Sequence, residues 1–247
     1  REQRAAQRYH TNKLKQEIGG KVSSMQVLKR DGSKELVSLD KISNRVSILA
    51  TGLSIDPIIV AQKAIAGLYD NITTKEIDNY LAETAAALTV EHPDYSYLAA
   101  RIKANSLHKE TPGFAIASRL LHEDGLLNDE YYNKIKNNIK LIESIIDYDR
   151  DYHLDYFALT TLIRAYLLKV DSKTLERPQD LWMRVAITVS GKVFNIENIK
   201  IAYNAISKGY YTHATPTLFN SGLKMQQLSS CFLIGMEDDS IDGIFNT

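Results

Sequence analysis

The sequence predicts a mainly α-helical protein with one small β-hairpin near its N-terminal end. Apolar residues recur at three- and four-residue spacing through most of the chain after residue 40, which is the period of an α-helix. Capping residues precede several of these runs, as they do where helices begin. The hairpin is indicated by Asp31-Gly32 between two short strand-like runs, because glycine accepts the positive φ of a tight turn.

The composition is that of a globular protein that can bury a sizeable core. Of the 247 residues 44% are hydrophobic and 24% are charged, and this length suits two folding units. Lys+Arg and Asp+Glu each number 30, so no overall field draws the chain to nucleic acid or to an anionic membrane. We therefore expect neither partner, and any anion site must be local.

Several other classes are disfavoured. The single cysteine excludes an internal disulfide framework and a zinc ribbon, and the six histidines lack metal-ligand spacing, so we expect no metal site. No apolar run approaches the roughly 20 residues that span a bilayer and no signal peptide opens the chain, which predicts a cytoplasmic location. The chain opens at Arg1 rather than Met and stops at Thr247 within an apolar, acidic pattern, so we expect a fragment.

The first half of the chain reads as an arm, a hairpin and a helical bundle. Residues 1–24 are charged and amide-rich and predict a loosely ordered arm. Four helices are expected after the hairpin, and Gly52 should end the first of them. Their expected starts are Asp40 as a cap, Asp56-Pro57, Thr73 with Glu76 in a capping box, and Pro93-Asp94. The breaker cluster Thr111-Pro112-Gly113 predicts a domain boundary.

The second half is again mostly helical. Residues 121–146 have apolar positions at helical spacing, and the acidic, aromatic run 147–156 interrupts them. Further helices are expected from Pro178 and over residues 196–207. Residues 213–222 are turn-rich, and the nearly apolar run 228–236 predicts a buried strand.

The hairpin tip is the first candidate site. Lys29 and Arg30 precede the turn, and Glu35 to Lys41 return to a helix start, so cations and a helix N-terminus could face one phosphate. The alternative is a solvated hairpin with ordinary surface charges. Asp78, in an otherwise apolar helix, could accept hydrogen bonds from a sugar hydroxyl, or it could be an exposed helix-face aspartate.

Two further clusters lie near the end of the chain. Ser229-Ser230-Cys231 places a thiol beside two hydroxyls, which suits a redox or nucleophilic group but also a packed free cysteine. Asp238-Asp239-Ser240 offers too few oxygen ligands for a metal, so we expect a turn or a helix cap there.

The order of these motifs resembles the class I ribonucleotide reductase large (alpha) subunits of eukaryotic type. Met25 to about Glu110 is similar to the ATP-cone, a nucleotide-sensing domain with a β-hairpin and a four-helix bundle, in the Val-Leu-Lys-Arg-Asp-Gly opening, Thr73-Thr74 and His92-Pro93-Asp94-Tyr95. The later part is similar to the family's helical region and the first strand of its ten-stranded α/β barrel, above all in residues 213–222 and 227–233. The resemblance implies an arm (1–24), an ATP-cone (25–111), a helical domain (112–212) and the start of a truncated barrel (213–247).

The resemblance also implies roles for individual residues. The activity site, where ATP activates and dATP inhibits, would consist of Lys29, Arg30, Glu35, Leu36, Val37, Ser38, Leu39, Asp40, Lys41, Thr74, Asp78 and Lys109. Thr215 and Ser230 would touch the substrate, and Cys231 would be one of two redox-active thiols. Asp239, Ser240 and Ile241 would begin the specificity site. Thr215 stands where serine is common, a change that keeps the hydroxyl. Ser106 stands where some bacterial relatives have histidine, and this difference leaves open how strongly dATP inhibits.

In this family a thiyl radical initiates reduction of ribonucleoside diphosphates to deoxyribonucleoside diphosphates for DNA synthesis and replication. By resemblance the partners would be a metal-containing small subunit that supplies the radical, a second large subunit in a dimer or higher oligomer, and thioredoxin or glutaredoxin as reductant. The thiyl cysteine and the partner of Cys231 would lie beyond Thr247, so we expect no turnover from this chain alone.

Two alternatives compete with an enzyme. A non-enzymatic ATP/dATP-sensing module is the first, since ATP-cones also occur in transcriptional repressors; those carry a Cys-rich zinc ribbon, which one cysteine cannot supply. The second is a purely helical interaction scaffold, which would leave the hairpin charges and the Ser-Ser-Cys run without a purpose.

Overall fold

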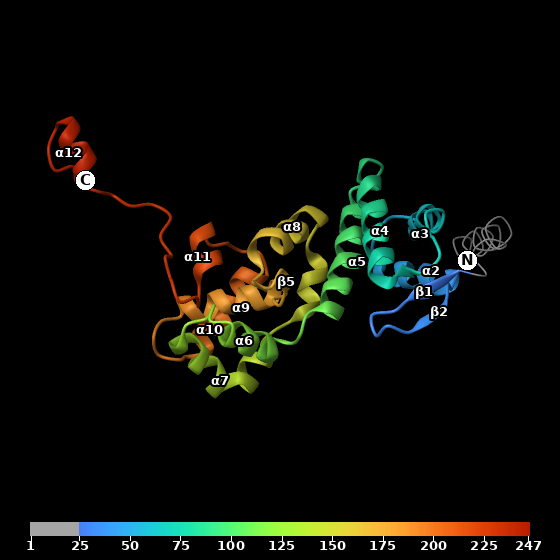
Figure 1. Ribbon diagram of the computed structural model, residues 1–247, viewed down its shortest axis with the longest axis horizontal. Helices are drawn as coiled ribbons and strands as arrows, with labels where there is room; N and C mark the ends of the chain where they lie inside the picture. The colour runs from blue at the N-terminus through green and yellow to red at the C-terminus, as the bar shows by residue number, and fades with distance from the viewer. Residues whose placement is uncertain (1–24) are drawn as a thin grey trace. The chain divides into compact units, whose positions relative to one another are not determined.

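The computed structural model describes residues 25–247, which form two compact units, each built from two separate segments (Figure 1). The first unit contains residues 25–113 together with Asp147–Gln179, and the second contains Phe114–Ile146 together with Asp180–Thr247. The predicted arm, residues 1–24, lies outside the described residues. Compactness alone does not test the predicted boundaries 25–111, 112–212 and 213–247, which stay predictions.

A three-stranded sheet opens the first unit. Strands β1 (Gln26–Leu28) and β2 (Lys34–Leu36) pair antiparallel as the predicted hairpin, and β3 (Ile72–Thr73) pairs parallel with β1. Gly32 has φ +83° in the turn, and the Asp31 carboxylate accepts hydrogen bonds from the Ser33 N–H (2.9 Å) and hydroxyl (2.6 Å). The positive φ confirms the reason for expecting glycine there. Strand β3 was not predicted, because two residues carry no period.

Four α-helices complete this part: α2 (Leu39–Leu49), α3 (Pro57–Ile65), α4 (Thr74–Ala87) and α5 (Asp94–Glu110), with a 3₁₀ turn η1 (Leu88–Val90) before α5. Asp56 caps α3 through the Ile58 N–H (2.9 Å), as predicted. The prediction that Asp40 caps α2 is wrong. Ser38 is the cap and accepts from the Lys41 N–H (3.3 Å), because the chain is still extended at Ser38 while Asp40 is already helical.

The start of α4 contains the predicted capping box. The Thr73 hydroxyl accepts from the Glu76 N–H (3.1 Å), and the Glu76 carboxylate accepts from the Thr73 N–H (2.8 Å). Hydrogen bonds from the Thr73 hydroxyl and N–H, and then from Tyr69, lower the pKa of Glu76 below its ordinary value. The carboxylate therefore stays charged beside the positive end of the helix.

Replacing Thr73 by alanine should lower the free energy of unfolding by about 1 kcal/mol, the usual effect of losing an N-cap side chain. Urea denaturation followed by circular dichroism measures the change. Thr84→Ala on the same helix is the control, because the Thr84 hydroxyl only donates to the Tyr80 carbonyl inside the helix (2.7 Å). Equal effects of the two substitutions would show that the cap does not stabilise α4.

The core of the first unit lies where the sheet and helices α2–α5 meet. Helices α4 and α5 lie side by side and make the most extensive helix contact of the unit (Figure 1). Their facing residues include Leu81, Ala85, Leu98, Ala99 and Ile102, all fully buried or nearly so. This packing holds the start of α4 beside the end of α5, and it thereby positions the polar residues that these two helix ends carry.

The segment 147–179 packs on the other side of α5. It contains η2 (Tyr148–His153), α8 (Tyr156–Thr161), a short π-helical turn η3 (Leu162–Tyr166) and a hairpin of β4 (Lys169–Val170) and β5 (Lys173–Thr174). Ala100 and Ala104 of α5 form a buried cluster with Leu159 of α8. Asp171 and Ser172 both have positive φ (48° and 66°) in the two-residue hairpin turn.

A buried polar cluster joins this segment to α5. The Asp151 carboxylate is fully buried and lies 2.7 Å from His108 Nε2 of α5. It also accepts a hydrogen bond from the Gln179 side-chain amide (2.9 Å). The Arg177 guanidinium lies over the Tyr148 ring at 4.7 Å from its centroid and donates to Thr111. The acidic, aromatic run thus serves as a packed joint in the fold.

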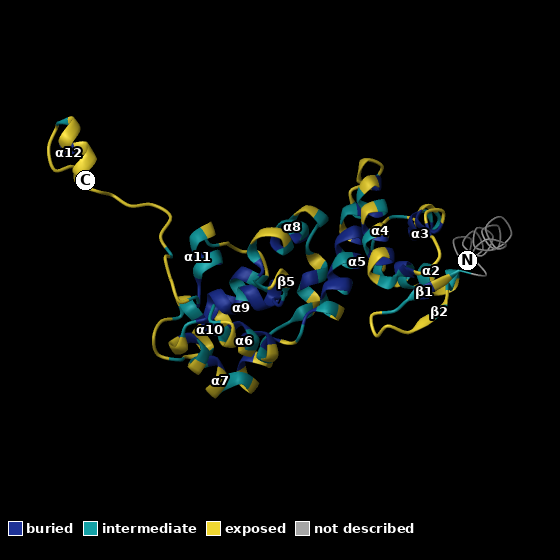
Figure 2. Ribbon diagram, viewed as in Figure 1, coloured by how far each residue is buried: buried dark blue, intermediate teal, exposed yellow. Residues whose placement is uncertain are grey.

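The second unit is helical. It contains α6 (Phe114–Glu123), α7 (Asp129–Glu143), α9 (Pro178–Val189, whose first two residues belong to the first unit), α10 (Ile196–Ser207), α11 (Thr215–Asn220) and α12 (Ile241–Asn246). Helix α9 is almost entirely buried (Figure 2), and the buried Arg184 donates to the Ser221 carbonyl (2.8 Å). Helices from Pro178 and over residues 196–207 were predicted and are confirmed.

Two predictions for residues 213–236 are wrong. The turn-rich stretch 213–222 contains helix α11, because Pro216 presets helical φ at its start and Thr217 and Leu218 are buried. The run 228–236 is no buried strand: it has no regular structure and is mostly exposed (Figure 2). A strand needs a neighbour for its backbone hydrogen bonds, and none of the described strands lies beside it. The mainly helical class with a small hairpin sheet is confirmed, without a barrel strand.

None of the helices formed by residues 25–247 is both long enough and apolar enough to cross a membrane.

Candidate functional site

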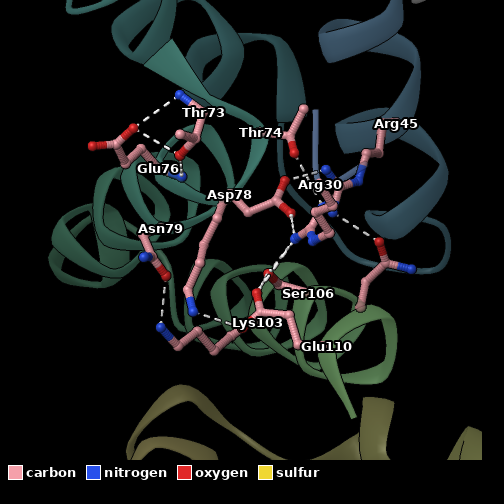
Figure 3. A network of polar contacts seen from close by, with 12 residues as sticks. Arg30, Arg45, Thr73, Thr74, Glu76, Asp78, Asn79, Lys103, Ser106 and Glu110 are labelled. Carbon is pink, nitrogen blue, oxygen red and sulfur yellow. Dashed lines mark hydrogen bonds and ion pairs between the residues drawn. The ribbon is translucent and has the colours of Figure 1, made fainter. Parts of the chain in front are cut away.

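A buried carboxylate lies at the centre of the polar residues in the first unit. Asp78, in the second turn of α4, is 1% exposed, and each of its oxygens faces a different guanidinium (Figure 3). Arg30 Nη2, from the hairpin, lies 2.9 Å from Oδ2, and Arg45, from α2, pairs with Oδ1. Burying a charge requires such partners, so Asp78 is no exposed helix-face aspartate.

Arg30 connects three elements. Besides Asp78, its guanidinium donates to the hydroxyls of Thr74 (3.4 Å) and Ser106 (2.9 Å) and to the Glu110 carboxylate (3.4 Å) (Figure 3). The hairpin is therefore fixed to α4 and α5 through one side chain. Arg30 is not an ordinary surface charge.

Arg45 was not predicted as a site residue, although it lies one helical turn after Lys41. Its Nη2 donates to the Asn105 amide oxygen (2.8 Å), whereas its Nε is buried without a hydrogen-bond partner among the described residues. Asn105 and Glu110 were also missed. Sequence spacing could suggest that Lys41 and Arg45 share a face of α2, but only the folded chain shows that this face meets Asp78.

The hairpin and the start of α2 carry a second group of charged residues. Glu35 accepts from Lys41 Nζ (2.6 Å) and pairs with Lys29. Hydrogen bonds from Lys29 and then Lys41 lower the pKa of Glu35, and the same contact with Glu35 raises the pKa of Lys29. Lys29 and Lys41 thus share the Glu35 carboxylate, and the role of Lys29 as a phosphate ligand stays a prediction.

A cavity of about 130 Å³, here called the hairpin cavity, lies between the sheet, α2 and α4. Its apolar wall includes Val27, Ile42, Ile77 and Leu81. The predicted residues that line it are Glu35, Val37, Ser38, Lys41, Thr74 and Asp78, together with the unpredicted Arg45. A cavity with an apolar wall and a few convergent polar groups is the usual form of a small-molecule site.

The other predicted activity-site residues lie around this cavity without lining it. Leu36 is 60% exposed on β2, Leu39 packs partly into the core, and Asp40 lies in the first turn of α2. Arg30 and Lys109 line a second cavity. Burial and the nearby Arg45 lower the pKa of Lys109, with a further contribution from Arg30 and an opposing one from Asp78.

The residues predicted to bind substrate and to read specificity are not brought together. Thr215 is exposed at the start of α11, and Ser230 and Cys231 are exposed in the irregular stretch after it. Asp239 and Ile241 are exposed too, while Ser240 caps α12 through the Gly243 N–H (3.0 Å). Of these clusters, the structure bears out only the helix cap expected at 238–240. Within residues 25–247 no group of three or more His, Cys, Asp or Glu could hold a metal ion.

Comparison with known proteins places this site in a family context. Residues 25–110 match the model of the ATP cone domain, and residues 152–226 match that of the ribonucleotide reductase all-alpha domain. Similar curated proteins include the ribonucleoside-diphosphate reductase large chain of Schizosaccharomyces pombe, which is 45% identical over 90% of this chain and 29% of the relative. Large chain 2 of Saccharomyces cerevisiae is 46% identical over 90% of this chain and 27% of the relative. The large subunit of Caenorhabditis elegans is 46% identical over 91% of this chain and 30% of the relative.

The chain spans less than a third of the length of these relatives. The two matched domains follow one another in this chain and together take up more than half of it. With an ATP cone, a ribonucleotide reductase all-alpha domain and this similarity over nine-tenths of its length, the chain belongs to the family of ribonucleotide reductase large subunits.

Proposed function

We propose that the first unit binds ATP and dATP as allosteric effectors, at the hairpin cavity and the Arg30–Asp78 cluster. The observation that carries the proposal is Asp78, a buried carboxylate held between two arginines at the wall of a partly apolar cavity. The apolar wall suits a base, and hydroxyl and carboxylate groups at Thr74 and Asp78 suit a sugar. Arg45 Nε is a buried donor that a ligand oxygen could satisfy.

For the whole protein we propose ribonucleoside-diphosphate reductase activity with ATP/dATP control, the activity for which the relatives are named. In this proposal Thr215 and Ser230 contact the substrate, Cys231 is one of the redox-active thiols, and Asp239, Ser240 and Ile241 belong to the specificity site. The partners would be a metal-containing small subunit, a further large subunit and thioredoxin or glutaredoxin, in the cytoplasm.

Reducing a ribose by a dithiol takes two electrons and leaves a disulfide, and this chain has one cysteine. It cannot close a disulfide within itself. We therefore propose that the 247-residue chain does not turn over alone and that nucleotide sensing is the part of the function it retains. The match of residues 152–226 to the reductase all-alpha domain favours this over a free-standing sensor, because a sensor needs the ATP cone only.

Titration calorimetry of the chain with ATP and dATP tests the proposal. We expect saturable binding near neutral pH, and ligand at 100 times its Kd should raise the free energy of unfolding by about 2.7 kcal/mol in a parallel thermal melt. CTP is the control for the base. Absence of binding by ATP and dATP would remove the effector function, and steady reduction of a ribonucleoside diphosphate by the chain alone would contradict the proposed inactivity.

A further inference from the structure

The hairpin cavity is too small for a whole nucleotide. Its volume of about 130 Å³ falls below the range of about 300–1,000 Å³ that is usual for small-molecule pockets. If a nucleoside enters it, the phosphates must lie elsewhere. Arg30, which pairs with Asp78 at the wall of this cavity, also lines a second and larger one.

The second cavity, here called the lysine cavity, has a volume of about 560 Å³ and lies within the first unit. Helices α4 and α5, η3 and the β4–β5 hairpin supply its walls. Its basic residues are Arg30, Lys75, Lys103, Lys109 and Lys173. The predicted site included Arg30 and Lys109; the other three lysines come from α4, α5 and β5 and had no predicted role.

Positive charge is in excess in this cavity. Glu110 is the one carboxylate among the described residues that line it, and it is shared by Lys75 (2.8 Å) and Arg30 (3.4 Å). Burial alone would raise the pKa of Glu110, but hydrogen bonds from Lys75 and Ser106 outweigh burial and lower it, so this carboxylate stays charged. One lining carboxylate nevertheless faces five cations, of which Arg30 also pairs with Asp78, which does not line this cavity.

The lysines are held without being fully neutralised. Lys103 donates to a neutral acceptor, the Asn79 amide oxygen (2.7 Å; Figure 3). Burial and the neighbouring guanidinium groups lower the pKa of Lys109, so its positive charge is less favoured here than in water. Like charges gathered around one cavity repel each other, and a bound polyanion would relieve that repulsion.

The walls also carry hydroxyl groups suited to phosphate oxygens. Ser106, which is buried, lines the cavity beside the Arg30 guanidinium, and Ser172 and Thr174 line it from the β4–β5 hairpin. Phosphate is usually recognised by several ammonium and guanidinium groups together with such donors. The volume of about 560 Å³ and the local charge favour a small polyanion over nucleic acid, whose binding needs an extended basic face.

We propose that the lysine cavity holds the polyphosphate chain of the nucleotide, with Lys75, Lys103 and Lys173 as phosphate ligands. The inference rests on the proposed function and adds three residues to it. Because the phosphates furthest from the nucleoside would meet most of these lysines, affinity should rise in the order AMP, ADP, ATP. A nucleoside monophosphate should depend little on the three lysines.

The test is calorimetry on the 247-residue chain with ATP, AMP and inorganic tripolyphosphate. Lys103→Gln keeps a hydrogen-bonding group for Asn79, and Lys173→Ala changes an exposed strand residue, so neither should disturb the fold. Each variant loses one charged phosphate contact, and we expect each to bind ATP and tripolyphosphate about tenfold more weakly than the wild type. Tripolyphosphate should also compete with ATP.

Lys63→Ala is the matched control, because the substitution removes one positive charge, as the two test variants do. Lys63 lies on α3 and is not among the described residues that line either cavity. The ATP affinity of this control variant should equal that of the wild type. Unchanged ATP affinity in Lys103→Gln and Lys173→Ala would overturn this inference and leave the effector function standing. An equal loss in Lys63→Ala would also overturn it, by pointing to a general charge effect. Failure of the wild type to bind ATP would remove the effector function and this inference with it.

Discussion

Replacing Asp78 by asparagine is expected to weaken ATP binding by at least about tenfold and to lower the free energy of unfolding by about 2–3 kcal/mol. The substitution keeps the shape of the side chain but removes the charge that holds Arg30 and Arg45. Breaking a buried ion pair usually costs about 3–5 kcal/mol. We expect less here because the two arginine side chains are 29% and 28% exposed, so water screens their charges.

Nucleotide binding and stability should both depend on Asp78 for the same reason. Arg30 lines the lysine cavity and Arg45 lines the hairpin cavity, so loss of Asp78 frees a cation in each. The nucleotide would then have to order both side chains as it binds. Calorimetry of Asp78→Asn should be done at a temperature where circular dichroism shows that the variant is folded. The loss of ATP affinity is then separated from unfolding.

Glu83→Gln is the control for Asp78→Asn, because it removes one negative charge from an exposed position of the same helix. It should change neither ATP affinity nor stability appreciably. ATP affinity of Asp78→Asn equal to that of the wild type would show that the carboxylate does not organise the site.

The local signals of the sequence were sufficient for most of residues 25–113 but not for the elements of the segment 147–179. Asp56-Pro57 and the Thr73–Glu76 pair act within one helical turn, so their effects can be read from spacing alone. Ser38 was missed as a cap because choosing between Ser38 and Asp40 depends on where the chain leaves the sheet. That point is set by the Val37 N–H, which bonds to the Met25 carbonyl (2.9 Å) on the neighbouring strand.

The candidate site was predictable only in part, because its residues meet through tertiary contacts. The hairpin charges predicted an anion site. Arg30 lines the lysine cavity, whereas Lys29 is engaged by Glu35 across the hairpin. Lys103 and Lys173 are 70 residues apart in sequence and share a cavity only because the β4–β5 hairpin packs near α5. No spacing rule finds such a pair.

The stretch around Cys231 shows where composition misleads a prediction of structure. The apolar run 228–236 has the composition of a buried strand, yet composition cannot supply the neighbouring strands that would pair with it. Its large apolar side chains, including Phe232 and Leu233, are exposed instead. The roles of Cys231, Thr215 and Ser230 therefore stay predictions from resemblance.

Replacing Asp151 by alanine is expected to have the largest effect on stability, a loss of about 3–5 kcal/mol in the free energy of unfolding. Its carboxylate is fully buried and holds the His108 ring and the Gln179 amide, which would lose a partner in a site closed to water. His108 immediately precedes Lys109 on α5, so the substitution should also weaken nucleotide binding by loosening that end of the helix.

Asp149→Ala is the matched control, since Asp149 lies in the same 3₁₀ turn and is exposed. Urea denaturation should show a large loss for Asp151→Ala and a change within about 0.5 kcal/mol for Asp149→Ala. Asp151→Asn should recover part of the loss, because an amide oxygen still accepts from Gln179. Equal midpoints for the alanine variants at positions 149 and 151 would mean that the buried cluster does not hold the segment 147–179 on α5.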